Sequence, residues 1–213
     1  LAGGDTTASV NGLAIGVTAA GDVAKDRIAY RSGAKPNDLI CLSGDLGAAY
    51  MGLHLLEREK RACGGQPDPK PKFEGHEYIL GRQLKPEART DIIERLAEAG
   101  IVPTSMIDIT DGLASETLHL CKSSGCGARI YLDRLPIARQ THDMAEELHT
   151  DPVVAALNGG QDYELLFTVP LSKQQEIFAL GVDVIGHVTA AGTGAMLVTP
   201  DGSEIALKAP GWK

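Results

Sequence analysis

The stretch MIDITDGLAS, residues 106–115, carries the pattern that decides the fold. An apolar run typical of a buried strand ends inside it, and a segment with helical spacing begins there, so we predict a strand-to-helix turn. Asp108 and Asp111 stand three residues apart at this turn, with the hydroxyl of Thr110 between them. Two carboxylates at one turn require a physical reason.

Two interpretations of this turn follow from the residues. Aspartate and threonine commonly cap a helix, because their oxygens accept hydrogen bonds from its first N–H groups and negative charge suits the helix dipole. Hard oxygen ligands at the end of a strand also suit Mg²⁺, which bridges carboxylates to the phosphates of a substrate. One aspartate is enough for a cap, so a cap alone leaves the second carboxylate unexplained.

The rest of the chain alternates irregularly between strand-like and helix-like segments. Strands are predicted at 13–20, 39–44, 103–110, 128–137, 162–170, 182–189 and 195–208, the last as a hairpin that turns at Asp201-Gly202. Helices are predicted at 45–60, 89–99, 112–124, 141–149 and 172–180, with a proline- and glycine-rich loop at 61–75. This order indicates an α+β fold rather than a regular doubly wound sheet.

The composition disfavours several classes of function. The chain has 213 residues, 43% of them hydrophobic, and a formal net charge of −8. An acidic chain is a poor candidate for sequence-independent nucleic-acid binding, and a phosphate ligand would need a metal ion as mediator. The four cysteines form no C-x-x-C pair, and neither a run of about 18 apolar residues nor a signal peptide is visible. We therefore expect a cytoplasmic protein that does not enter the membrane.

Glycine, arginine and tryptophan residues outside the first turn are further candidates for ligand contacts. GGDTT (3–7) lets the backbone approach a ligand at Gly4 and supplies another carboxylate at Asp5, although a plain turn has the same composition. Arg31 lies in a polar loop, where it can bind a phosphate with both arms of its guanidinium or simply face solvent. Trp212 is the only tryptophan, and it either packs on the domain or stacks on an aromatic ligand.

The segment GGQDYELLF, residues 159–167, repeats the pattern of two glycines, polar residues and a strand. If this strand begins at Asp162, then Asp162 and Glu164 share one of its faces, because side chains alternate along a strand. The alternative is a hairpin corner with a solvated acidic face. The residues alone do not separate these two interpretations.

Four motifs taken together resemble one family. They are GGDTT (3–7), RSGAKPND (31–38), IDITDGLAS (107–115) and GGQDYELLFT (159–168). In this order they are similar to the thiamine-monophosphate kinases of the aminoimidazole-ribonucleotide-synthetase superfamily, and the resemblance runs nearly end to end. It implies that ATP and thiamine monophosphate give ADP and thiamine diphosphate by direct phosphoryl transfer, in which positioning and Mg²⁺ provide the catalysis.

The resemblance also implies a role for each matching residue, with no residue acting as a covalent catalyst. The implied Mg²⁺ ligands are Asp5, Asp108 and Asp111. The implied ATP contacts are Gly4, Asp5, Arg31 and Thr110. The implied contacts to thiamine monophosphate are Gln161 and Trp212, the tryptophan against a ring of thiamine.

The sequence departs from the family pattern in two respects. The family usually has glutamate at the position of Gln161, so the charge that would face the cationic thiamine is lost. Most of the N-terminal domain is also absent. By this resemblance, residues 1–30 are the remnant of an N-terminal ATP-binding domain. Residues 31–213 are then a whole C-terminal domain with a mixed or antiparallel sheet and packed helices. We expect this chain alone not to turn over, and the full-length protein to be a homodimer.

Three alternatives stay open beside this resemblance. The first is a sister ATP-dependent synthetase of the same superfamily that acts on another small molecule. The second is a non-catalytic domain that binds a nucleotide or a protein partner, favoured only by Gln161 in place of glutamate. The third is a structural domain whose acidic residues are helix caps, which four motifs in the family order make a weaker explanation.

Overall fold

The computed structural model describes residues 18, 20–64 and 70–209. Most of the predicted strand at 13–20 therefore lies outside the described residues. Gly4, Asp5 and Trp212, the predicted ligand contacts near the two ends of the chain, also lie outside them. Within the described part of the chain, no helix is long and apolar enough to cross a membrane.

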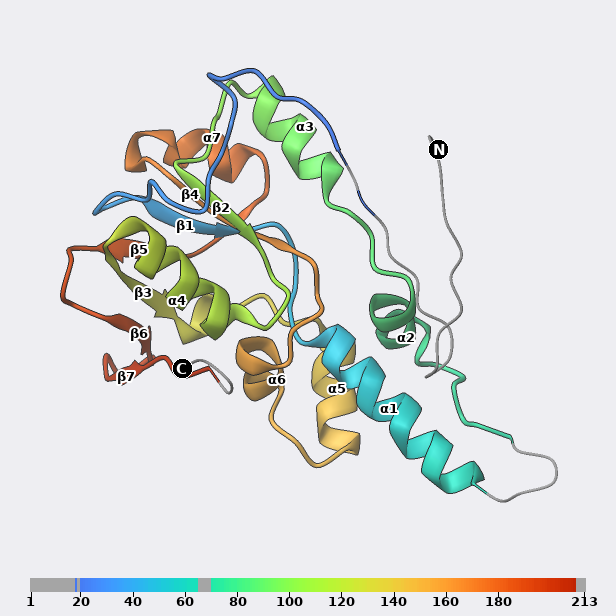
Figure 1. Cartoon of the computed structure of the whole chain (residues 1–213). Helices are drawn as coiled ribbons and strands as arrows, with labels where there is room; N and C mark the ends of the chain where they lie inside the picture. Colours follow the sequence, from blue (N-terminus) through green and yellow to red (C-terminus); the bar gives the residue numbers. More distant parts are fainter. Residues whose placement is uncertain (1–17, 19, 65–69, 210–213) are drawn as a thin grey trace, which may run out of the picture.

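A seven-stranded mixed sheet forms the centre of the described structure (Figure 1). Its strands are β1 (Leu39–Leu42), β2 (Ser105–Asp108), β3 (Gly127–Tyr131), β4 (Leu165–Val169), β5 (Asp183–Thr189), β6 (Ala195–Val198) and β7 (Glu204–Ala206). They lie in the order β2-β4-β1-β5-β3-β6-β7. All neighbours are antiparallel except β3 and β6, which run parallel. The predicted α+β fold with a mixed sheet is confirmed.

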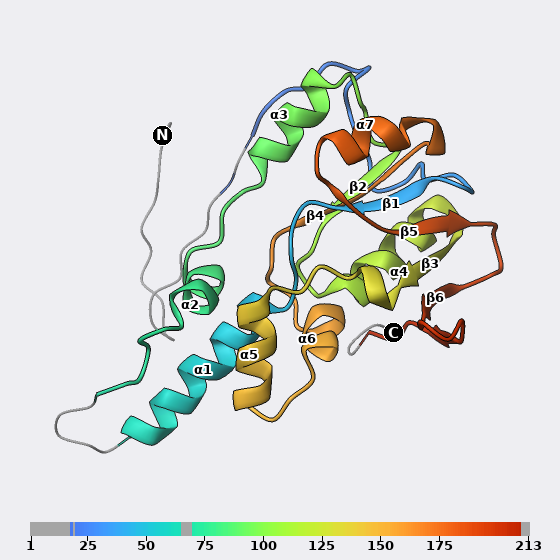
Figure 2. The ribbon, with the colours of Figure 1, turned by 180° about the vertical axis from the view of Figure 1, so that it is seen from behind.

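Helices cover both faces of this sheet. They are α1 (Ala48–Cys63), α2 (Glu77–Leu84), α3 (Thr90–Glu98), α4 (Leu113–Ser124), α5 (Arg139–Glu147), α6 (Pro152–Asn158) and α7 (Gln174–Ala179). One core cluster packs α4 against one face, and a second packs α3 and α7 against the other. A third cluster joins α1, α2, α5 and α6, which Figures 1 and 2 show grouped to one side of the sheet.

The central strands are apolar on both faces, which explains the continuous hydrophobic runs of the sequence. In β1, Ile40 and Leu42 belong to the cluster beneath α4, whereas Leu39 and Cys41 belong to the cluster beneath α3 and α7. Phe167 of β4 is fully buried in the second of these clusters. Because the sheet is covered on both faces, all of β1 and nearly all of β4 are buried, and alternation between polar and apolar residues disappears there.

The structure adds two helices to those expected from the sequence. Helix α2 follows the predicted loop, and helix α6 follows α5 directly. The start of α6 carries a recognisable signal, because Asp151 accepts a hydrogen bond from Val153 N at 2.8 Å and Pro152 occupies the first turn. The predicted strand at 128–137 was too long, since it ends at Tyr131 and continues as a 3₁₀ turn.

Two phenylalanines provide a direct test of this core. We expect Phe167→Ala to lower the free energy of unfolding by about 3–5 kcal/mol, because the side chain is fully buried between β4, α3 and α7. Phe178→Ala in α7 is the matched control, since that ring is 55% exposed and its loss should change stability by about 0.5 kcal/mol or less. Urea denaturation of both variants measures the difference, and equal effects would contradict this description of the core.

Candidate functional site

The candidate site lies where the loop after β2 meets the loop before β4. Three backbone hydrogen bonds extend the β2–β4 pairing into these loops. Gln161 N donates to Thr110 O at 2.7 Å, Tyr163 N to Ile109 O at 3.0 Å, and Ile109 N to Glu164 O at 2.7 Å. Two motifs that lie about fifty residues apart in the sequence thus form one structural unit.

Two glycines make this close approach possible. A Cβ atom on Gly160, which has φ 71°, would lie 2.3 Å from Thr110 O. A Cβ atom on Gly112, which has φ 107°, would lie 2.6 Å from Leu157 O. Both distances are far below van der Waals contact, and both φ values are disfavoured for residues with a side chain. Gly160 is therefore a steric requirement of the contact between the loops, and Gly112 is one of the contact between the turn and the end of α6.

The first turn presents its polar groups to solvent. Asp108, Thr110 and Asp111 are all exposed, and Thr110 Oγ1 donates to Asp108 Oδ2 at 2.5 Å. Helix α4 begins after Gly112 without a side-chain cap, so the capping explanation of this turn is wrong. Instead, Asp111 N donates to Glu116 Oε1 at 3.0 Å. Both aspartate carboxylates are left available to a ligand.

Glu116 is a site residue that the sequence analysis missed. Its side chain lies in the first turn of α4 and is 4% exposed. Burial raises the pKa of this carboxyl group above its ordinary value, although the hydrogen bond from Asp111 N opposes the shift. A glutamate a few residues after a turn is a common signal for backbone contacts at a helix start. It holds the backbone of the turn that carries the aspartates.

The donor set of this turn fits a hard divalent cation. Carboxylate oxygens and a hydroxyl are ligands that Mg²⁺ accepts, together with phosphate oxygens and water. Within residues 18, 20–64 and 70–209, no group of three histidine, cysteine, aspartate or glutamate side chains is placed to hold a metal. Asp108 and Asp111 supply two carboxylates, and the third predicted ligand, Asp5, lies outside this range.

The structure of the GGQDYE segment matches neither interpretation of its sequence, the extended strand or the solvated hairpin corner. It is not extended, because Gln161 and Tyr163 have φ values of 60° and 53°, and β4 begins only at Leu165. Its acidic side chains are not solvated either, since Asp162 is 3% exposed and Glu164 is 1% exposed. Gln161 itself is exposed, and its backbone N–H donates to the carbonyl oxygen of Thr110, which is also exposed. Of the three polar residues, only Gln161 is accessible to a ligand.

Asp162 anchors this loop to the start of helix α1. Its carboxylate accepts hydrogen bonds from Gly47 N at 2.9 Å and from Ala49 N at 3.3 Å. These are free amides of a first helical turn, where negative charge is favoured. Burial nevertheless raises the pKa of Asp162 to about 6.

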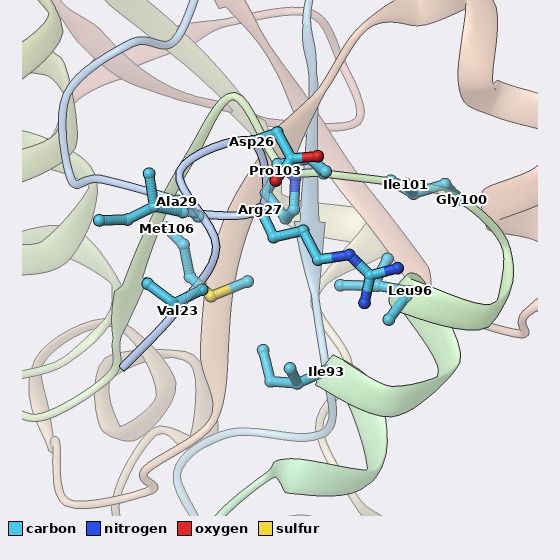
Figure 3. A pocket seen from close by; sticks show the side chains of 13 residues that line it. Val23, Asp26, Arg27, Ala29, Ile93, Leu96, Gly100, Ile101, Pro103 and Met106 are labelled. Carbon is cyan, nitrogen blue, oxygen red and sulfur yellow. The ribbon is translucent and has the colours of Figure 1, made fainter. Parts of the chain in front are cut away.

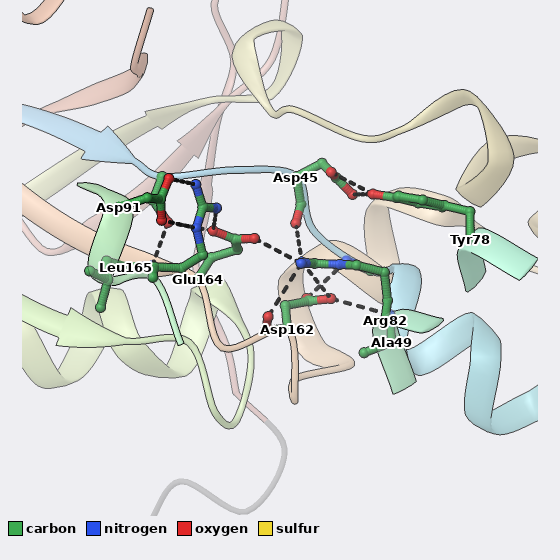
Figure 4. A network of polar contacts seen from close by, with 11 residues as sticks. Asp45, Ala49, Tyr78, Arg82, Asp91, Asp162, Glu164 and Leu165 are labelled. Carbon is green, nitrogen blue, oxygen red and sulfur yellow. Dashed lines mark hydrogen bonds and ion pairs between the residues drawn. The ribbon is translucent and has the colours of Figure 1, made fainter. Parts of the chain in front are cut away.

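Glu164 anchors the loop from its other end, through two arginines. One carboxylate oxygen accepts from Arg82 Nη1 at 2.9 Å, and the other accepts from Arg89 and from the hydroxyl of Ser43 (Figure 4). The Ser43 hydroxyl also accepts from Leu165 N at 2.8 Å. Both oxygens of this buried carboxylate therefore have hydrogen-bond donors, two of them from arginines. These partners could not be predicted from the sequence, because the nearer arginine lies 75 residues away.

Arg31 lies along the exposed edge of β2. The carbonyl of the preceding Tyr30 accepts from Met106 N at 2.9 Å, and a Cβ atom on Gly33 would lie 2.4 Å from Thr104 O. The Arg31 residue is exposed. Its predicted contact with a nucleotide phosphate stays a prediction.

An apolar groove of about 540 Å³ lies between the segment that precedes Tyr30 and helix α3 (Figure 3). Its walls include Val23, Ile93, Leu96 and Met106. Among the described residues, none of those predicted to bind metal, nucleotide or substrate lines it. The candidate site is therefore a polar surface at the loop contact, distinct from this groove.

Comparison with known proteins relates the whole chain to one family. The family model for the C-terminal domain of AIR synthase related proteins matches residues 35–199. The thiamine-monophosphate kinase of Escherichia coli K12 is 36% identical over 222 residues, covering 100% of this chain and 62% of the relative. That of Bacillus subtilis is 30% identical over 218 residues, covering 100% and 63%. The chain thus spans about three-fifths of these relatives.

Solved structures agree with this relation. Thiamine monophosphate kinase from Aquifex aeolicus superposes with a TM-score of 0.66 at 30% identity, covering 85% of this chain and 55% of that one. A structure described as AaThiL complexed with AMPPCP and TMP gives a TM-score of 0.67 at 31% identity. This match covers 84% of this chain and 52% of that one. A hydrogenase maturation protein HypE in complex with ATP gives a TM-score of 0.67 at 15% identity, covering 90% of this chain and 56% of that one. This is a similarity of fold alone.

The positive φ of Gln161 gives a prediction about the geometry of this loop. We expect Gln161→Val to lower the free energy of unfolding by about 1–2 kcal/mol, because a β-branched residue is strained at φ 60°. Gln161→Gly and Gln161→Asn should show no such loss, since both residues tolerate this conformation. Gln140→Val, at an exposed position in α5, is the control for the substitution itself. Urea denaturation ranks the variants, and a tolerated valine at position 161 would contradict the loop geometry.

The raised pKa of Asp162 gives a second prediction. Its folded pKa of about 6 exceeds the ordinary 3.8, so its favourable contribution is complete below about pH 4 and is lost as the pH rises through about 6. Relative to Asp162→Asn, which does not titrate, the free energy of unfolding should fall by about 2 kcal/mol between pH 4 and pH 7. Urea denaturation at several pH values measures this difference, and a pH-independent difference would refute the assignment.

Proposed function

The chain belongs to the family of AIR synthase related proteins, and we propose that the complete protein is a kinase that makes thiamine diphosphate from thiamine monophosphate, ATP and Mg²⁺. The observation that carries this proposal is the loop contact, which brings the exposed aspartates next to Gln161. The thiamine-monophosphate kinases of E. coli and B. subtilis, 36% and 30% identical over the whole chain, support it.

The carboxylates of the first turn have the role of metal ligands in this proposal. Asp108 and Asp111, together with Asp5, hold Mg²⁺ against the phosphates. When bound, the metal neutralises the charge that develops during phosphoryl transfer. The backbone of the turn is fixed before any ligand arrives, because Asp111 N is bound to Glu116 and Thr110 O is bound to Gln161 N. Preorganisation of this kind lowers the barrier without a covalent step.

The nucleotide contacts surround this turn. Thr110 gives its hydroxyl proton to Asp108, so its oxygen is oriented with lone pairs free to accept from a ligand or water. Arg31 offers a planar guanidinium that matches two phosphate oxygens at once. Gly4, beside Asp5, lets the backbone approach the nucleotide.

Gln161 and Trp212 have the role of substrate contacts. The amide of Gln161 accepts and donates hydrogen bonds without charge, so it recognises polar atoms of thiamine rather than its positive charge. Its backbone N–H is bound to Thr110 O, so the position of Gln161 is fixed against the 109–112 turn. Trp212 provides a flat apolar surface on which a thiamine ring stacks.

The domain organisation is part of the same proposal. Residues 1–30 are the end of an N-terminal ATP-binding domain, and residues 31–213 are the C-terminal domain. The complete protein is a cytoplasmic homodimer that does not bind nucleic acid or membranes, and the 213-residue chain alone does not turn over. The net charge of −8 supports the exclusion of nucleic acid.

The test uses the complete protein with thiamine monophosphate, ATP and Mg²⁺, and measures thiamine diphosphate by chromatography. We expect Asp108→Asn and Asp111→Asn to lower kcat at least about 100-fold, because each removes a charge from the metal site. Their thermal stability should not change, since both side chains are exposed. Asp143→Asn, an exposed carboxylate in α5, is the control and should keep wild-type activity.

Two results would contradict the proposal. The first is a folded wild-type protein that forms no thiamine diphosphate at saturating ATP and Mg²⁺. The second is an Asp108→Asn variant with the wild-type kcat and the wild-type requirement for Mg²⁺. In the same assay, the 213-residue chain alone should give no thiamine diphosphate.

A further inference from the structure

Arg82 reaches from helix α2 into the loop that carries Gln161. Its guanidinium donates to Glu164 Oε1 at 2.9 Å, to Asp45 O at 3.0 Å and to Asp162 O at 3.3 Å (Figure 4). The side chain is 19% exposed. A single arginine thus binds one carboxylate and two backbone carbonyls from two different segments. Five N–H donors in a rigid fork allow this, whereas a lysine ammonium lacks the fork geometry.

The loop held by Arg82 has a backbone that its own sequence does not favour. Gly160, Gln161 and Tyr163 have φ values of 71°, 60° and 53°. Glutamine and tyrosine rarely occupy this region, because the left-handed conformation crowds Cβ against the carbonyl oxygen. Such a conformation persists only where the surrounding contacts fix it, and it concentrates at functional sites. The contacts that fix this loop therefore determine where Gln161 lies.

Arg82 occupies a particular place among these contacts. Asp162 is fixed through Gly47 N and Ala49 N, and Glu164 is fixed through Arg89 and Ser43. Among the residues that the structure describes, Arg82 is the only side chain that hydrogen-bonds both Asp162 and Glu164. Those two residues flank Tyr163 directly and lie within three positions of Gln161. Arg82 therefore links the two residues on either side of Tyr163 through hydrogen bonds to both.

We propose that Arg82 is a positioning residue: through Asp162 and Glu164 it holds the 160–163 loop against the 109–112 turn, so that Gln161 meets the phosphoryl acceptor in a fixed place. The inference rests on the proposed kinase function and deepens it. Arg82 touches no substrate in this account. Its effect is transmitted by the hydrogen bonds from Gln161 N to Thr110 O and from Tyr163 N to Ile109 O.

A purely structural role for Arg82 predicts a different result. In that case the arginine only docks α2, whose Ile79 is already buried in the cluster formed by α1, α2, α5 and α6. Its substitution would then lower stability and leave the affinity for substrate unchanged. A positioning role instead predicts that KM for thiamine monophosphate changes and that KM for ATP does not, since Gln161 contacts the acceptor and not ATP. A displacement of about 1 Å is enough to reduce catalysis about 100-fold.

The test compares Arg82→Lys with Arg129→Lys in the complete protein. Arg129 is the matched control, because it is 16% exposed and binds Glu204 and the carbonyls of Thr193 and Gly194, at the other end of the sheet. Both lysines keep a charge opposite the carboxylate. We expect Arg82→Lys to raise KM for thiamine monophosphate about 10-fold to 100-fold and to leave KM for ATP unchanged. Arg129→Lys should change neither constant.

Amide hydrogen exchange provides a readout that does not depend on activity. In Arg82→Lys, the amides of Gln161 and Tyr163 should exchange faster, while those of β5 should keep the wild-type rate. If Arg82→Lys does not fold, the double variant Arg82→Met/Glu164→Gln removes both charges together. The Michaelis constants and the amide exchange rates are then measured on that variant.

Unchanged exchange at Gln161 and Tyr163 would overturn the positioning role, as would a KM for thiamine monophosphate equal to that of Arg129→Lys. A wild-type protein without kinase activity would overturn the proposed function instead. The exchange rates would then decide by themselves whether Arg82 holds the loop.

Discussion

The hydrogen bond from Gln161 N to Thr110 O, 2.7 Å long, joins the two loops on which the candidate site depends. It requires a backbone contact so close that a Cβ atom on Gly160 would collide with the same carbonyl. It also requires φ of 60° at Gln161, a conformation that the residue does not favour. The loop that carries the exposed aspartates and the loop that carries the exposed glutamine lie side by side as a consequence.

The rest of the fold supplies the forces that keep these loops together. The β2–β4 pairing delivers both loops to the same end of the sheet, and buried side chains on both faces hold that pairing. Beyond the strands, Asp162 is bound to the start of α1 and Glu164 is bound to arginines from α2 and from the segment before α3. The acidic residues of GGQDYE thus serve the structure, and the exposed glutamine that precedes them is left for a ligand.

The parts of this architecture that depend on local chemistry could be predicted from the sequence. Apolar runs located β1 and β4, helical spacing located α1 and α4, and the Asp201-Gly202 turn located the last hairpin. The parts that depend on distant partners could not. Asp162 and Glu164 are buried because of groups 115 and 82 residues away in the sequence. No local pattern distinguishes such carboxylates from solvated ones. The capping explanation of the Asp108 turn failed for a local reason, because α4 begins without a side-chain cap and Asp111 N donates to Glu116 instead.

The most direct measurement is a crystal structure of the complete protein with Mg²⁺, a non-hydrolysable ATP analogue and thiamine monophosphate. We expect Mg²⁺ to be bound by carboxylate oxygens of Asp108 and Asp111. We also expect thiamine monophosphate beside Gln161 and an unchanged hydrogen bond from Gln161 N to Thr110 O. Phosphates and metal bound without either aspartate, or a loop that rearranges when the ligands bind, would contradict the account.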